Sequence, residues 1–179
     1  MSLNLRSELL GAWHSTRPGQ SPATVLRQHH AIEHATVTII GRRAPGSQLI
    51  ARSDLQGFIV YGDVETAILQ ASAEEALARL QAGEAALAVH PNCGTNLATA
   101  GILSGLAAFV AGSGRSRSLW DRVPSAILGA TLALIVSVPL GRWAQANITT
   151  TDRVYGLRIA SVTKVADGPV VRHRVTISV

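Results

Sequence analysis

Two short clusters of metal-binding residue types stand out in this 179-residue sequence. The first is His30-Ala31-Ile32-Glu33-His34, which lies in a segment with a helical pattern. On a helix, residues three and four apart lie on one face, so both imidazoles can reach one ion. In such a site the histidines hold Zn²⁺, and a carboxylate that is not a ligand takes a proton from the bound water. The cluster predicts His30 and His34 as metal ligands and Glu33 as a catalytic base.

The second cluster runs from His90 to Asn96 and has the sequence H-P-N-C-G-T-N. A histidine and a cysteine three residues apart are good ligands for zinc. Pro91 and Gly94 predict a turn that lets both side chains point one way. The sequence therefore predicts that His90 and Cys93 complete the metal site. A cysteine on its own is more often a small buried apolar residue, so this prediction depends on both clusters.

Three functions are compatible with these residues. The leading one is a membrane-bound zinc-dependent hydrolase, with a peptidase as the finer candidate. In it His30 and His34 bind Zn²⁺ with His90 or Cys93 as third ligand, and Glu33 activates the water. If all four side chains bind the ion, the site is closed and structural, and the protein is a membrane scaffold or assembly factor. A third possibility makes Cys93 a nucleophile, but it leaves the histidine pair without a role.

The first cluster is expected on a helix over residues 23–40 that begins at Ser21-Pro22 and ends at Gly41. The other elements expected before residue 90 are strands over 48–51 and 57–61 joined by a turn at Ser53-Asp54, a helix over 64–81 ended by Gly83, and a strand over 85–89. This order predicts a small α/β layer that carries the metal site.

The middle of the chain has the composition of a membrane segment. Charged residues make up only 15% of the sequence, against about 25% in soluble globular proteins. Two uncharged stretches, 97–111 and 123–141, approach the roughly 20 residues needed to cross a bilayer. Both are rich in Gly and Ala, which allow helices to pack closely in lipid. We expect a transmembrane helical hairpin over 97–141, and the alternative is a buried helical pair in a soluble core.

The end of the chain changes to a period of two. Residues 153–165 and 170–179 alternate, and Asp167-Gly168 between them predicts a β-hairpin. Two membrane crossings return the chain to one side, so this hairpin can join the earlier strands. The expected fold is α+β, divided into an N-terminal segment 1–20, an α/β metal-site domain 21–96, the transmembrane hairpin 97–141, and residues 142–179, which complete the soluble domain.

The charge and the cysteine content of the sequence limit the classes of partner and the cellular location to be expected. The net charge is +5, but the arginines are scattered, aromatic residues are only 4%, and no nucleic-acid motif is present. We therefore expect a lipid bilayer and a membrane-associated peptide or lipid substrate as partners, with no nucleic acid. Cys93 is the only cysteine, and no apolar stretch of signal-peptide length begins the chain, so the soluble domain is expected in the cytoplasm. The sequence leaves oligomerisation open.

The two clusters together resemble uncharacterised families of prokaryotic membrane proteins, domains of unknown function, some of which are predicted metal-dependent enzymes. The segments that carry the resemblance are H-A-I-E-H-A-T from His30, G-F-I-V-Y-G-D from Gly57 and H-P-N-C-G-T-N from His90. The resemblance implies a prokaryotic cell-membrane protein with a metal site. The order H-x-x-E-H also resembles that of reversed-zincin peptidases, although no equivalent of their distant third-ligand glutamate is identified here.

Overall fold

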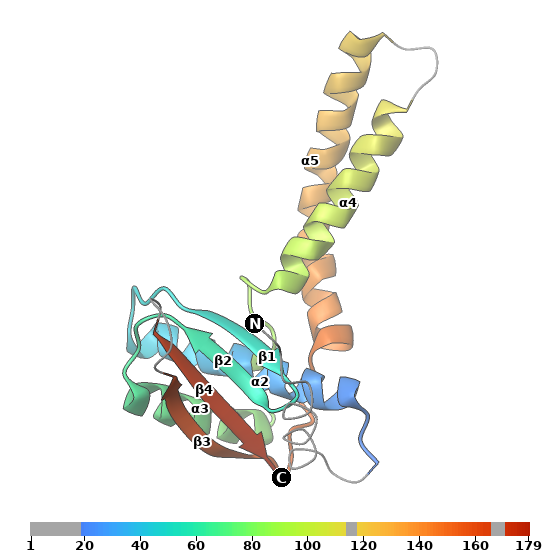
Figure 1. Cartoon of the computed structure of the whole chain (residues 1–179). Coiled ribbons are helices and arrows are strands. Elements are labelled where there is room, and N and C mark those ends of the chain that lie inside the picture. Colours follow the sequence, from blue (N-terminus) through green and yellow to red (C-terminus); the bar gives the residue numbers. More distant parts are fainter. Residues whose placement is uncertain (1–18, 114–117, 166–170) are drawn as a thin grey trace, which may run out of the picture. The chain divides into compact units, whose positions relative to one another are not determined.

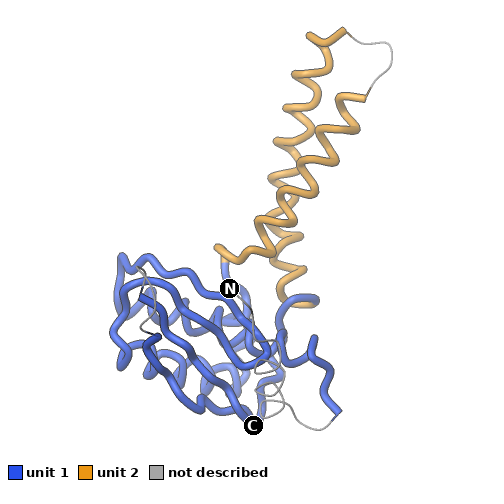
Figure 2. Tube along the Cα trace, in the orientation of Figure 1, with its two compact units in different colours: residues 1–90, 148–179 blue, residues 91–147 orange. Residues whose placement is uncertain are grey.

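The computed structural model describes residues 19–113, 118–165 and 171–179. Almost all of the predicted N-terminal segment 1–20 and the predicted turn at Asp167-Gly168 lie outside this part. The chain forms two compact units (Figure 2). Unit 1 consists of residues 1–90 and 148–179, and unit 2 consists of residues 91–147.

Unit 1 contains a four-stranded antiparallel sheet in the order β1-β2-β4-β3. The strands are β1 (Ile50–Asp54), β2 (Gly57–Tyr61), β3 (Arg158–Val165) and β4 (Arg172–Ser178). β3 and β4 pair with each other, and β4 also pairs with β2. The prediction that the C-terminal β-hairpin joins the sheet of the N-terminal half is therefore confirmed, and the fold is α+β.

Two helices pack against one face of this sheet, α2 (Pro22–Arg43) and α3 (Thr66–Gln81) (Figure 1). The buried face of the sheet presents alternate residues of β2 and β4, as the period-two pattern requires. These residues and the facing positions of the two helices form one apolar core, which includes Phe58, Val60, Val175, Ile177, Ile32, Ile39, Leu69 and Leu80. The residues of the first cluster lie on α2, and this core fixes that helix on the sheet.

The start of α2 agrees with the prediction, but its end does not. Ser21 is the N-cap, and its hydroxyl oxygen accepts a hydrogen bond from the Thr24 amide. The helix runs through Gly41 and ends at Arg43. An isolated glycine costs a helix only about 1 kcal/mol, whereas Pro45 disfavours helical geometry for the residue before it. The stop signal is therefore the proline.

Two other local predictions are wrong. β1 continues through Asp54, so the β1–β2 turn falls at Leu55 and Gln56. Residues 85–89 do not form a strand, because Ala85–Ala88 forms a 3₁₀ turn in which Leu87 and Ala88 are buried. This run contains no β-branched residue before Val89, and β-branched residues are the ones that favour strands.

Unit 2 contains a pair of packed helices, α4 (Gly94–Gly112) and α5 (Leu119–Ala144). α5 continues into the π-helical turn η2 (Gln145–Thr149), whose last two residues belong to unit 1. Both helices are long and apolar enough to cross a membrane. None of α4 and only 6% of the apolar window of α5 is buried. Large apolar side chains such as Leu97, Phe109 and Ile135 are mostly exposed. Within the described part of the chain, the two helices are therefore largely unburied.

Candidate metal centre

The two histidines of the first cluster meet on α2. The ring centroids of His30 and His34 lie 4.2 Å apart at an interplanar angle of 59°. His34 is buried and His30 is partly buried. This is the arrangement that the i, i+4 spacing predicts for residues on one helical face.

Backbone carbonyls orient both rings. Nδ1 of His34 lies 2.7 Å from the carbonyl oxygen of Ala88, and Nδ1 of His30 lies 3.1 Å from that of Thr149. A carbonyl oxygen only accepts, so each Nδ1 carries a proton, and Nε2 is the nitrogen left to bind an ion. Histidine ligands of metal ions commonly donate their second ring N–H in this way. The two contacts thus orient both rings as in histidine ligands that bind through Nε2.

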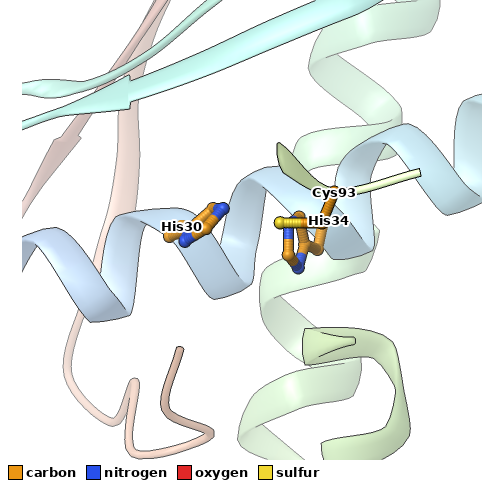
Figure 3. A group of neighbouring side chains, drawn as sticks. All are labelled: His30, His34 and Cys93. Carbon is orange, nitrogen blue, oxygen red and sulfur yellow. The ribbon is translucent and has the colours of Figure 1, made fainter. Parts of the chain in front are cut away.

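The third member of the group is Cys93. One ligand atom each of His30, His34 and Cys93 lies within 4.8 Å of the others (Figure 3). Cys93 is buried and is the N-cap of α4, where its Sγ accepts a hydrogen bond from the Thr95 amide at 3.4 Å. The positive end of a helix favours negative charge on such a sulfur. The three side chains could hold a metal ion.

The spacing of the group suits a small ion after a modest contraction. Neighbouring ligands around tetrahedral zinc, with bonds of about 2.0–2.3 Å, lie about 3.3–3.7 Å apart. The atoms here lie within 4.8 Å of one another, so binding of a zinc ion would draw the more distant ones together. In the part of the chain that the structure describes, no other set of three His, Cys, Asp or Glu side chains has such spacing.

His90, the other predicted ligand, lies beside this group and outside it. Its ring centroid is 5.9 Å from that of His34, and its side chain is partly exposed. The structure thus brings together three of the four predicted ligand residues and leaves His90 adjacent to them.

Glu33, which precedes His34 on α2, is buried and is not a member of the ligand group. It is 7% exposed, and one oxygen of its carboxylate accepts a hydrogen bond from the Ser53 hydroxyl of β1. The sequence did not indicate this role for Ser53, because the residue was expected in a turn. Extending the predicted strand to residue 54 would have placed Ser53 on one face of the sheet, because side chains alternate between the two faces of a strand.

His29 belongs to the core. It is fully buried, and its Nδ1 lies 2.8 Å from the carbonyl oxygen of Asp54. Its Nε2 has no hydrogen-bond partner in the described part of the chain. Burial lowers the pKa of this imidazole, which favours the neutral form.

Comparison with known proteins assigns a family. Residues 25–162, more than half of the chain, match the domain of unknown function DUF6391. An uncharacterised protein of the cyanobacterium Picosynechococcus sp. is 35% identical over 148 residues, which cover 74% of this chain and 69% of that protein. No solved structure matches the chain. The chain belongs to the DUF6391 family, and its match includes the histidine pair, Cys93 and both long apolar helices.

Proposed function

We propose that this protein is a membrane-bound zinc-dependent hydrolase. His30, His34 and Cys93 hold the ion, and Glu33 activates a water in the fourth position. The observation that carries the proposal is the convergence of three ligand atoms within 4.8 Å, with both imidazole rings oriented through Nδ1. Three protein ligands leave one position of a tetrahedral ion open, which is the arrangement of catalytic zinc sites.

The donor set favours zinc. One thiolate and two imidazoles are borderline-soft ligands, and Cys₂His and His₂Glu sites of similar composition occur in zinc enzymes. When bound, zinc lowers the pKa of its water to about 7 and so supplies a nucleophile at neutral pH. A buried carboxylate that is not a ligand can then accept the proton of that water. Glu33, whose carboxylate Ser53 holds, fits this role.

The attachment of Cys93 to α4 suggests the substrate class. Cys93 directly precedes Gly94–Gly112, the first helix that is long and apolar enough to cross a membrane. A ligand at the end of such a helix lies at the depth of the lipid headgroups when the helix spans the bilayer. A membrane-associated peptide or lipid is therefore the proposed substrate, in a prokaryotic cell membrane with the soluble unit on the cytoplasmic side.

A second function is favoured by the position of His90. Its ring centroid lies 5.9 Å from that of His34, and rotation of its side chain could supply a fourth ligand. The site would then be a closed Cys-His₃ zinc site that stabilises a membrane scaffold. Glu33 would be a buried carboxylate without a catalytic role.

X-ray absorption at the zinc edge of the loaded protein, with a His90→Ala variant, separates these functions. The hydrolase predicts one sulfur, two imidazoles and one oxygen around the ion, with the same metal content in His90→Ala. One sulfur and three imidazoles, with metal loss in His90→Ala, would support the scaffold. A screen against membrane-embedded peptides and lipid esters follows, in which Glu33→Gln keeps its zinc and loses turnover.

A further inference from the structure

The π-helical turn η2 (Gln145–Thr149) stands where α5 ends, and its first side chain is a buried amide. Gln145 is fully buried. Its Nε2 donates to the side-chain oxygen of Asn96 at 2.6 Å, so this amide pair joins the first turn of α4 to the end of α5.

Asn96 holds the loop that carries Cys93. Its side-chain Nδ2 donates to the carbonyl oxygen of Pro91 at 2.8 Å. Its backbone amide donates to the carbonyl oxygen of Cys93 at 3.0 Å. The other end of the same side chain accepts from Gln145. One amide group therefore fixes the turn on which the sulfur ligand stands and ties that turn to α5.

Close contact between the helices makes this arrangement sensitive to their packing. At Gly141, one turn before Gln145, a Cβ would meet the side-chain oxygen of Asn96 at 2.5 Å and its Cα at 3.2 Å. The approach of α4 to α5 at this level therefore depends on glycine. If the helices separated, the bond between Asn96 and Gln145 would lengthen and the loop would lose its support.

The opposite end of η2 holds the other side of the metal centre. The carbonyl oxygen of Thr149, its last residue, is the partner of Nδ1 of His30. The next carbonyl oxygen, of Thr150, accepts from Nε and Nη2 of Arg27 at 3.1 and 2.9 Å. A five-residue turn thus positions a histidine ligand through its last carbonyl and the cysteine loop through its first side chain.

We propose that η2 and the Asn96–Gln145 pair couple the packing of the helical hairpin to the metal centre, so that separation of α4 from α5 lowers the affinity for zinc. This inference rests on the proposed metal site and adds its regulation. Because coupling is reciprocal, zinc also holds the two helices together at this level.

The test uses the full-length protein in detergent micelles and in lipid nanodiscs. Zinc affinity is measured by competition with a chromophoric chelator for wild type, Asn96→Ala, Gln145→Ala and the double variant. Loss of a group that orients a metal ligand typically weakens metal binding about 10–100-fold, and we expect this for both single variants. Because the two residues act through one hydrogen bond, their effects on zinc affinity should not add. We expect the double variant to bind zinc only slightly less tightly than the single variant with the lower affinity.

The matched control is Asn147→Ala. It removes an amide of the same turn whose Nδ2 donates to the carbonyl oxygen of Trp143 within the helix, and we expect wild-type affinity. Cobalt substitution supplies a second measurement, because a sulfur-to-cobalt charge-transfer band reports coordination by Cys93. We expect this band to weaken in Asn96→Ala and Gln145→Ala and to stay unchanged in Asn147→Ala.

The outcomes are distinct. Wild-type zinc affinity and an unchanged cobalt spectrum in both single variants would overturn the coupling and leave the metal centre standing. Equal losses in Asn147→Ala and Gln145→Ala would also overturn it, because they would indicate general disruption of the turn. If Asn96→Ala does not fold, Gln145→Ala decides, since it leaves the loop contacts of Asn96 in place. A wild-type protein that binds no zinc would overturn the coupling and the proposed function together.

Discussion

The close approach of α4 and α5 at Gly141 gives a prediction whose size follows from the geometry. In Gly141→Ala, the new methyl group would lie 2.5 Å from Oδ1, 3.2 Å from Cα and 3.3 Å from Cγ of Asn96. The terminal oxygen can rotate away only by breaking its 2.6 Å bond with Gln145. The Cα belongs to the backbone, so the helices must also move apart by a few tenths of an ångström. Overpacking of this kind typically costs about 1–3 kcal/mol.

Gly101 supplies the matched control. A Cβ added there meets nothing within 4 Å. Both substitutions gain the same helix propensity, about 1 kcal/mol for alanine over glycine. The difference between the two variants therefore isolates the steric clash, and Gly141→Ala is expected to be less stable than Gly101→Ala by about 1–3 kcal/mol.

The assay is unfolding in mixed micelles with increasing sodium dodecyl sulfate, followed by circular dichroism at 222 nm. Wild type, Gly141→Ala and Gly101→Ala are compared at one lipid-to-detergent ratio. We expect an earlier midpoint for Gly141→Ala and an unchanged or later one for Gly101→Ala. Equal midpoints for the two variants would refute the argument, because the helices would then tolerate a methyl group where the structure leaves no room.

Three further predictions concern unit 1. Ser21→Ala should lower the free energy of unfolding by about 1 kcal/mol through loss of the N-cap, as measured by denaturant titration, and no change would contradict the cap seen at Thr24. Gly57→Ala should cost at least about 2 kcal/mol in the same titration, because φ is +142° and a Cβ would lie 2.1 Å from the carbonyl oxygen of Val175; a smaller loss than for Ser21→Ala would refute this. Burial lowers the pKa of His173, so the unfolded chain takes up a proton first as the pH falls through about 6.5. Stability should therefore decrease on acidification, and His173→Gln should lose part of that dependence in thermal melts between pH 7.5 and 5; an unchanged slope would contradict the assignment.

Side-chain spacing predicted the parts of the site that one element carries. The i, i+4 spacing of His30 and His34 depends only on helical geometry, so the helix signal at Ser21-Pro22 was sufficient to place both rings together. The pairing of β4 with β2 was also predicted from the sequence, because alternating strands need a partner and the predicted transmembrane hairpin would return the chain to the same side.

The groups that orient the ligands were beyond sequence analysis. The carbonyl oxygens of Ala88 and Thr149 hold the two rings. Because every residue has a backbone carbonyl, the residue types do not indicate which carbonyls take this role. Residues 85–89 were predicted as a strand because the run is short and apolar, a pattern that does not separate a strand from a tight turn. The π-helical turn has no sequence signature, so the pairing of Gln145 with Asn96 emerged only from the folded chain.

The central claim is that His30, His34 and Cys93 bind a metal ion. The most direct measurement is the metal content per chain of protein purified in detergent without chelator, for wild type, His30→Ala, Cys93→Ala and Glu33→Gln. We predict about one zinc per chain in wild type and in Glu33→Gln, and its loss in His30→Ala and Cys93→Ala. A wild-type protein that carries no metal, even after zinc is offered, would contradict the account, and the histidine pair would then be buried polar structure.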